Sequence, residues 1–432
     1  MYLKDPTFAK LTSFENQIAK MLDFEMALAK VQGDLGIIPV EAAKLIHENL
    51  NGLKISAQEL ELGTLENGIP TITLLEIAKK SLPDFAKDYL HFGATSQDVM
   101  DTAQVLLSHE VLDSIEKSIH DLLEKLGQLI EKQGNNPMIG RTRTQHAVPI
   151  LFGQKVAGWA SPLLRHLDRL TELKPRLLTV QFGGAAGNLS ALGENGLKLL
   201  KQLAIELNLG SSFPWHNQRD NFAEFASWLG ILSGILGKIG ADILVMAQTE
   251  IGEIIENGKG GKSSTMPHKN NPILNEALVV LARKNATLLA VQMQSLVHAS
   301  ERDGTSWALE WDNLPEMMNN AGTAIKHANT IADNLRINAL AMISNLNRTN
   351  GLIFSEAATF ILAKKLTKKE AKMIVESACE KVVLEQKNLA DILDELTPEL
   401  QINWQDELRV EKHLGISYEI MKGVLAQINR KS

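Results

Sequence analysis

The sequence contains little cysteine and few aromatic residues. Among its 432 residues there is one cysteine, Cys379, and aromatic residues make up 5% of the chain. A single cysteine excludes an intrachain disulfide, which is typical of proteins in a reducing cytosol. The net charge of −7 disfavours nucleic acid as the main partner, because surfaces that bind nucleic acid carry an excess of Lys and Arg. We therefore expect a cytoplasmic protein that binds no nucleic acid.

Sequence motifs for metal and dinucleotide binding are also lacking. The 11 histidines are scattered, with no HExxH pattern and no cysteine cluster. The glycine-rich stretch FGGAAGN, residues 182–188, follows no predicted strand, so a dinucleotide-binding fold is not indicated. These observations predict an activity that needs no metal and no other cofactor.

The sequence has no unbroken apolar run of membrane-spanning length. Its most apolar stretch, Phe225 to Ile255, is interrupted by Lys238 and Asp242, whereas a span needs about 20 apolar residues. The first residues, MYLKDPTFAK, lack the apolar segment of a signal peptide. We interpret the apolar stretch as a helix at the centre of a soluble bundle, and we expect no membrane partner.

What the sequence does have is helical periodicity. Apolar residues recur every three or four positions over long segments, and no alternating β-branched run of useful length occurs. This pattern predicts an all-α fold whose helices are long enough to run the length of a bundle. The predicted helical segments are residues 14–36, 102–132, 156–178, 196–207, 225–255, 273–297, 317–334 and 370–384.

The breaks between helices suggest three domains. Short segments broken by prolines and glycines fill residues 1–97, and long helices then continue to residue 347. The stretch NRTNGLIFSE separates them from a last charged helical segment. We therefore predict a small N-terminal domain (1–97), a central long-helix bundle (98–347) and a small C-terminal domain (348–432).

One loop has the composition of an anion-binding site. The stretch GGKSSTMPHKNNP, residues 260–272, interrupts the helical pattern with glycines, hydroxyls and two lysines. Asn271 suits a helix N-cap and Pro272 the first helical position, so the positive end of a helix should face back into the loop. Lys269 and the free loop N–H groups favour a carboxylate or phosphate there. A surface loop that only caps a helix is the alternative.

Two further breaks carry more polar groups than capping needs. In HFGATSQDVMDTA, Thr95, Ser96 and Gln97 precede Asp98, and helix capping explains only one hydroxyl. In IGRTRTQHAVP, Arg143 stands among polar residues just before a long helix. Taken singly, a cap and a solvated turn remain open as alternatives.

Together the three loops resemble the signature regions of the fumarase/aspartase superfamily. Its G-S-S-x-M-P-x-K-x-N loop is similar to residues 263–271, and its T-S-x-D and G-R-T-x-x-Q elements match residues 95–98 and 140–145, in the same order along the chain. The resemblance implies a three-domain fumarase/aspartase-like fold with a central long-helix bundle. It also implies a homotetramer in which each active site gathers the three regions from different subunits.

The resemblance implies a role for each motif residue. Ser264, the second serine of the loop, would be the base that acts at a carbon beside a carboxylate, and Lys269 would support it. A serine can act as a base only where donors and positive charge stabilise its alkoxide. The residues that would bind the substrate are Thr95, Ser96, Gln97, Thr142, Arg143, Gln145 and Asn271.

The most informative departure from the superfamily pattern is Arg143. Fumarase and the amine-releasing lyases have histidine there, as part of the acid that protonates a poor leaving group. A lactone's ring oxygen leaves as a carboxylate, which needs no such proton, and an arginine binds carboxylates with two parallel hydrogen bonds. Lys262 also replaces the family glycine, Asn270 stands where arginine is common, and Asn188 where threonine is expected.

Within the superfamily the chain is most similar to the bacterial cycloisomerases that close 3-carboxy-cis,cis-muconate, a tricarboxylate of protocatechuate breakdown. The similarity extends to MLDFEMALAKVQGDLGIIP, QFGGAAGN and PWHNQRDNFAEFA. The alternative is adenylosuccinate lyase or another carboxylate lyase, which shares SSxMPHKxNP and QRD. A catalytically inactive, structural relative is a third hypothesis, against which the intact Ser264, Lys269 and Asn271 count.

Overall fold

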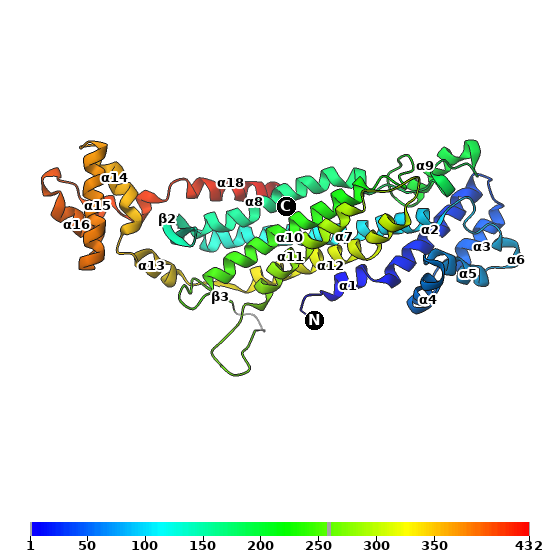
Figure 1. Ribbon diagram of the computed structural model, residues 1–432, viewed down its shortest axis with the longest axis horizontal. Coiled ribbons are helices and arrows are strands. Elements are labelled where there is room, and N and C mark those ends of the chain that lie inside the picture. Colours follow the sequence, from blue (N-terminus) through cyan, green and yellow to red (C-terminus); the bar gives the residue numbers. More distant parts are fainter. Residues whose placement is uncertain (1, 257–260, 432) are drawn as a thin grey trace. The chain divides into compact units, whose positions relative to one another are not determined.

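Helices dominate the computed structural model, which describes residues 2–256 and 261–431 (Figure 1). The predicted all-α class is therefore confirmed. The long helices are α7 (Ser96–Gln133), α8 (Phe152–Leu177), α10 (Asp220–Met246), α11 (Ile273–Gln294) and α12 (Gly304–Asn334). The only sheets within the described residues are a hairpin of β1 (Pro137–Thr142) and β2 (Gln145–Leu151), and a short pair of β3 (Ile254–Glu256) and β4 (Leu335–Ile337).

The chain divides into two compact units. The first contains Met1–Ser118, His166–Gly237 and Ala277–Lys326, and the second contains Ile119–Arg165, Lys238–Glu276 and His327–Ser432. Each unit is described below by itself. The three sequence domains, 1–97, 98–347 and 348–432, remain a prediction.

A cluster of small helices builds one core of the first unit. In Figure 1, the blue and light-blue helices α2 to α6 lie together, and α9 packs beside α2. Buried side chains such as Phe24, Leu74 and Phe182 fill the space between them. The helices of this cluster are α2 (Phe14–Asp34), α3 (Val40–Leu50), α4 (Ala57–Asn67), α5 (Thr71–Ser81), α6 (Asp84–Lys87) and α9 (Gly196–Glu206). The short α1 (Pro6–Leu11) precedes them, and its buried Phe8 packs at Gly322 of α12.

A buried amide joins the long helices of the first unit. Asn285 on α11 donates to Ser233 Oγ on α10 at 2.8 Å and to the Met317 carbonyl on α12 at 3.1 Å. Its own oxygen accepts a hydrogen bond from Asn320 at 3.1 Å. Because a buried polar group is costly unless it is hydrogen-bonded, these contacts favour one relative register of the three helices.

The second unit ends in a separate small helical cluster. Its core is formed by buried residues that include Val375, Leu393 and Trp404, whose indole Nε1 donates to Thr397 Oγ1 at 3.0 Å. Helix α13 packs against β1. The helices of this part are α13 (Ala339–Asn347), α14 (Ser355–Leu362), α15 (Lys368–Glu385), α16 (Leu389–Leu396) and α17 (Trp404–Glu407). The last helix, α18 (Ser417–Lys431), packs against β2 and α8 instead.

The apolar helix is shorter than the sequence pattern predicts. It ends at Met246 and not at Ile255. After a run of turns with Gly252 at φ 59°, the amide of Glu253 donates back to the Met246 carbonyl at 2.9 Å. By length and composition α10 is the one described helix that passes as a membrane span, yet 50% of its most apolar window is buried. With Phe225, Leu229 and Leu232 fully buried, it is a core helix.

Two other elements differ from the predictions. Helix α12 begins at Gly304 instead of residue 317, and it continues through Pro315. The proline removes one backbone hydrogen bond, but the burial of Leu314 and Met317 on either side keeps this segment helical. The hairpin was not predicted, because a β-bulge between Ile139 and Arg141 breaks the alternation of its first strand.

Candidate active site

The serine loop is a tight turn closed by its own backbone. Lys262 and Asn270 form an antiparallel bridge, and the Ser263 amide donates to the Lys269 carbonyl at 3.1 Å. At the base, the Asn271 amide donates to the Gly261 carbonyl at 2.8 Å. Gly261 has a φ of 79°, and a Cβ there would lie 2.0 Å from the Asn271 oxygen. The loop therefore needs glycine at this position, one residue before Lys262. Gly260 lies outside the described residues.

The two serines of the loop have different environments. The Ser263 hydroxyl accepts hydrogen bonds from the backbone amides of Met266 at 3.0 Å and Thr265 at 3.3 Å, so it belongs to the turn itself. Ser264 is exposed, and within the described chain its hydroxyl forms no hydrogen bond. Lys269 is also exposed. Ser264 is therefore the serine that is free to meet a ligand.

The helix after the loop begins at Ile273, as the helical periodicity predicts and one residue after the start that the capping pattern placed at Pro272. Its first turn is closed by the Glu276 amide, which donates to the Pro272 carbonyl at 3.1 Å, and α11 begins at Ile273. The Asn271 carbonyl instead accepts from the Ile273 amide at 2.9 Å, in a tighter turn. The positive end of α11 nevertheless follows directly on the loop, as an anion site requires.

The residues predicted around Arg143 form the tip of the β1–β2 hairpin. Thr142 and Gln145 are the last paired residues, and Arg143 and Thr144 make a two-residue turn. Both turn residues have positive φ, 47° and 70°, which is the geometry of a type I′ turn but is unfavourable for a β-branched threonine. Strained turns of this kind are concentrated at functional sites. The four side chains are exposed and available for ligand contacts.

Arg141 holds the base of this hairpin. Its guanidinium donates to both carboxylate oxygens of Glu253, at 2.9 and 2.7 Å. Its ladder partner His146 is partly buried, and burial together with the charge of Arg141 lowers the pKa of His146 below 6.5. His146 is therefore neutral at pH 7 and unsuited to hold a proton for an acid step.

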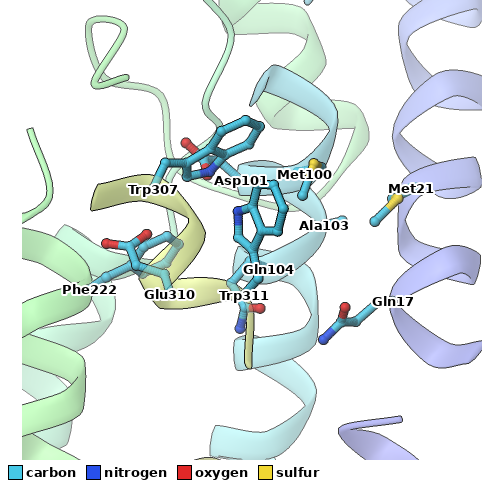
Figure 2. A pocket seen from close by; sticks show the side chains of 10 residues that line it. All are labelled: Gln17, Met21, Met100, Asp101, Ala103, Gln104, Phe222, Trp307, Glu310 and Trp311. Carbon is cyan, nitrogen blue, oxygen red and sulfur yellow. The ribbon is translucent and has the colours of Figure 1, made fainter. Parts of the chain in front are cut away.

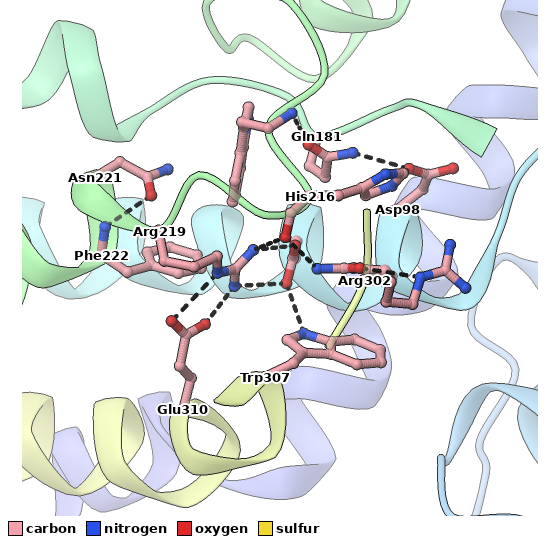
Figure 3. A network of polar contacts seen from close by, with 12 residues as sticks. Asp98, Gln181, His216, Arg219, Asn221, Phe222, Arg302, Trp307 and Glu310 are labelled. Atoms are coloured by element: carbon pink, nitrogen blue, oxygen red, sulfur yellow. Dashed lines mark hydrogen bonds and ion pairs between the residues drawn. The ribbon is translucent and has the colours of Figure 1, made fainter. Parts of the chain in front are cut away.

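In the first unit, Asp98 organises the Thr95–Gln97 region. This carboxylate is completely buried and accepts from the backbone amides of Thr95, Gly183 and Gly184 at 3.0, 2.8 and 2.9 Å. Its Oδ1 also lies 2.8 Å from Nε2 of His216, and it accepts from Gln181 Nε2 at 3.1 Å (Figure 3). The glycine-rich stretch 182–188 is thus fixed against the start of α7. Sequence reasoning placed Asp98 in the T-S-x-D element but predicted no role for its side chain.

The side chains of Thr95, Ser96 and Gln97 are less exposed to solvent than the exposed predicted site residues at the hairpin tip and in the serine loop. The Gln97 side chain is buried, donates to the His216 carbonyl at 2.8 Å and accepts from Arg302 Nε at 3.2 Å. Arg302 also donates to the Ala185 carbonyl at 3.0 Å. Thr95 and Ser96 are partly exposed. Sequence reasoning did not single out Arg302, although it follows the serine loop in a polar break of its own, SERDG.

His91 is held in place by a buried carboxylate. Its Nδ1 lies 2.6 Å from Oε1 of Glu25, a residue that is 1% exposed. Burial alone would lower the pKa of His91, but the charge and hydrogen bond of Glu25 outweigh it and raise that pKa above 6.5. The backbone of His91 has a φ of 63°, which turns the chain toward Thr95.

A second buried network surrounds Arg219 of the QRD motif. Arg219 donates to both oxygens of Asp101, at 2.6 and 3.0 Å, and also to Glu310 (Figure 3). Trp307 Nε1 donates to Asp101 Oδ1 at 3.0 Å. Burial raises the pKa of Glu310, while the charges of its two partners raise that of Arg219 against the effect of burial. With the charges of Arg219, Asp101 and Glu310 paired with one another, this network presents no open donor to a ligand.

A small cavity adjoins this network but is too small for a substrate. It has a volume of about 30 Å³, enough for a water molecule, and Figure 2 shows Asp101, Trp307 and Trp311 on its walls. Within the described chain, Gln104 Nε2 and Trp311 Nε1 are buried donors at this cavity without a partner. Nor do three His, Cys, Asp or Glu side chains of the described residues gather to hold a metal ion.

The predicted site residues therefore fall into two sets. Thr95, Ser96 and Gln97 lie in the first unit, and the hairpin tip and serine loop both lie in the second. The sequence profile of the lyase family matches residues 5–285. The chain belongs to this family, in the fumarase/aspartase superfamily.

Similar proteins in this lyase family carry several activities. The chain is 37% identical to 3-carboxy-cis,cis-muconate cycloisomerase of Pseudomonas putida, over 91% of this chain and 94% of that protein. It is also 37% identical to trans-aconitate decarboxylase 1 of Mycosarcoma maydis, over 90% of this chain and 79% of that protein. To N-acetyl-S-(2-succino)cysteine lyase of Enterococcus italicus it is 36% identical, over 88% of this chain and 84% of that protein. The crystal structure of the lactonizing enzyme for 3-carboxy-cis,cis-muconate from Pseudomonas putida matches with a TM-score of 0.94 at 35% identity, covering 99% of this chain and 98% of that one.

Proposed function

We propose that this lyase-family enzyme closes 3-carboxy-cis,cis-muconate into 4-carboxymuconolactone. The observation that carries the proposal is Arg143 at the exposed tip of the hairpin, where amine-releasing relatives have histidine. The similarity to a cycloisomerase over 91% of the chain supports it. The enzyme would act in the cytoplasm on a small tricarboxylate, without a metal or another cofactor.

The absence of an acid at the hairpin tip suits a lactone better than an alcohol or amine. Ring closure adds a carboxylate oxygen to one carbon of the diene, and the neighbouring carbon takes up a proton. In the reverse direction the ring oxygen leaves as a carboxylate, a stable anion that needs no protonation. Arg143 would bind a carboxylate with its two parallel N–H groups. The nearby His146 is no substitute acid, because its pKa is lowered.

Ser264 is proposed to move the proton at the carbon beside a second carboxylate. Its hydroxyl would donate that proton during ring closure and remove it in the reverse reaction. Lys269, Asn271 and the loop amides would stabilise the alkoxide and the aci-carboxylate that forms. Thr95, Ser96, Gln97, Thr142 and Gln145 complete the proposed binding set. Because one carboxylate becomes a neutral ester, each closure consumes one proton from solution.

The test is to offer the purified enzyme 3-carboxymuconate in chelator, with no nucleotide, and to follow ultraviolet absorbance together with an indicator dye. We expect the diene absorbance to disappear with one proton consumed per molecule. Adenylosuccinate, trans-aconitate and N-acetyl-S-(2-succino)cysteine are offered separately. Turnover of one of these, with none of the muconate, would refute the cycloisomerase and leave the family assignment in place.

A carboxylate lyase of another specificity is the second candidate. The 36% identity to N-acetyl-S-(2-succino)cysteine lyase favours it, because a thiolate is also a leaving group that needs less protonation than an amine. Adenylosuccinate lyase, the other lyase considered from sequence, releases an amine and is disfavoured by Arg143.

We also propose that the active site is shared between subunits of a homotetramer. The support is the superfamily membership and the wide separation of Thr95, Gln145 and Ser264 along the sequence. Ser264→Ala and Gln145→Leu should each be nearly inactive alone. Refolded as a mixture, they should regain activity at the minority of sites that receive both intact residues from different chains. Hybrid tetramers of confirmed size that remain inactive would show that both residues come from one chain.

A further inference from the structure

Glu253 lies where four parts of the second unit meet. Its amide donates to the Met246 carbonyl at the end of α10, and its carbonyl accepts from the Asn338 amide, each at 2.9 Å. Its carboxylate is completely buried and receives two hydrogen bonds from Arg141 of β1. A third donor, Asn345 Nδ2 of α13, reaches the same carboxylate at 2.9 Å.

Along the sequence, the same pair lies next to the hairpin tip and shortly before the serine loop. Arg141 is the residue before Thr142, and its pair with His146 is the second-last pair of the hairpin before the turn. Glu253 is the residue before β3, and the serine loop follows β3 in the sequence. β3 is in turn fixed to β4 by the pairing of Ile254 with Ile337.

The contact has the geometry of a rigid clamp. The Arg141 side chain is 15% exposed and that of Glu253 is 0% exposed, so solvent screens their interaction little. Two parallel N–H···O bonds fix the orientation of the guanidinium as well as its distance, which a lysine ammonium would not do. The bulge between Ile139 and Arg141 re-aims the strand at this point.

We propose that Arg141 and Glu253 are positioning residues, which hold the Thr142–Gln145 tip and the root of the Ser264 loop each in a fixed place. In the proposed tetramer these two segments of one chain serve different active sites. Neither residue is proposed to touch the substrate. The inference rests on the proposed roles of Ser264 and Arg143, but not on which carboxylate is the substrate. A misplacement of about 1 Å costs an enzyme roughly 10²-fold in rate, so the effect on activity should be large.

The competing explanation is that the Arg141–Glu253 ion pair only stabilises the fold. Two variants that each replace one charged residue by glutamine, together with their double variant, distinguish this role from positioning. Arg141→Gln and Glu253→Gln each leave a buried charge without its partner, and each should lower the melting temperature and lower kcat about 10²-fold. The double variant removes both charges, so its melting temperature should recover most of the loss. Its kcat should stay at least about 10-fold below wild type, because the two-pronged contact is gone.

Hydrogen exchange of the substrate-free enzyme gives a second readout that does not depend on the substrate. The amides of Ser263, Lys269 and Asn271 are hydrogen-bonded within the loop, and they should exchange faster in the Arg141 and Glu253 variants. Trp404→Phe is the matched control: it removes a buried hydrogen bond to Thr397 in the C-terminal helical cluster and should lower the melting temperature with kcat and loop exchange unchanged.

Recovery of both kcat and melting temperature in the double variant would overturn the proposal, and so would unchanged loop exchange in the single variants. If Arg141→Gln does not fold, Arg141→Lys can be tested instead, because it keeps the positive charge and loses only the two parallel hydrogen bonds of the guanidinium. It should retain the melting temperature and still lose activity, and wild-type kcat in that variant would equally overturn the proposal. Activity is measured on whichever carboxylate the wild type converts, so failure on 3-carboxymuconate alone counts against the proposed function only.

Discussion

The two serines of the loop should respond very differently to alanine. Ser264 is exposed and its hydroxyl has no hydrogen bond within the described chain, so Ser264→Ala should leave the loop and the fold intact. If Ser264 is the base, kcat should fall at least about 10³-fold, the scale of losing a principal proton-transfer group in a preorganised site.

The expected loss for Ser263 follows from its contacts. Its hydroxyl accepts from the amides of Thr265 and Met266 at 3.3 and 3.0 Å, and the longer bond is weak. A net contribution of about 1 kcal/mol for such a contact corresponds to roughly a fivefold change in the population of the ordered loop. Ser263→Ala should therefore lower kcat by about fivefold, at least 100-fold less than Ser264→Ala.

The assay is steady-state turnover of the muconate by both variants, with circular dichroism as the check on folding. Ser263→Thr is the control, because it keeps a hydroxyl for the same two amides and should retain most activity. The reasoning is refuted if Ser263→Ala is the more damaging change. In that case the turn-forming serine is also the reactive one, and the assignment of Ser264 as base is wrong.

Three further outcomes are expected. Arg143→Gln should mainly raise KM if Arg143 clamps a carboxylate, whereas a fall in kcat at constant KM would indicate a proton donor. Asp98→Asn replaces one carboxylate oxygen by an NH2 group that faces two or three of its five hydrogen-bond partners, so it should lower the free energy of unfolding by about 3 kcal/mol; a denaturant midpoint equal to wild type would contradict this role. Because the pKa of His91 is raised above 6.5, its bond to Glu25 stabilises fully below pH 6.5 and loses this effect as pH rises through the raised pKa. The melting-temperature difference between wild type and His91→Gln should therefore shrink with rising pH, and a constant difference would contradict the assignment.

The helical fold class and the three candidate loops could be predicted from the sequence because local patterns indicate both. The period of α2 and the motif 263–271 lie in contiguous residues and need no knowledge of the fold. Helix ends were less predictable where tertiary contacts decide them. The predicted start at residue 317 missed the first turns of α12, which continue through Pro315 because its neighbours are buried. The end of α10 at Met246 is followed by turns and a backbone contact to Glu253 that the composition of the stretch does not reveal.

The supporting residues of the candidate site were harder to predict than the reactive ones. Asp98 bonds to residues far along the chain, at Gln181, Gly183 and His216. Glu253 lies near the end of the apolar stretch 225–255 with no pattern that marks it, and only the folded chain brings Arg141 to it. Such partners are separated by about 100 residues, so no spacing within a motif can indicate them.

This division between exposed reactive groups and buried supports has an energetic cause. Ser264, Lys269 and Arg143 are exposed, and each must exchange water for a ligand when a substrate binds. An exposed side chain cannot fix its own position, because few contacts oppose its rotational freedom. The orientation of the segments that carry exposed site residues must therefore come from buried, hydrogen-bonded groups, such as Asp98 in one unit and Glu253 in the other. The strained turn at Thr144, with φ 70°, fits the same logic, since its paired neighbours and the Arg141–Glu253 contact hold a conformation that the turn residues alone disfavour.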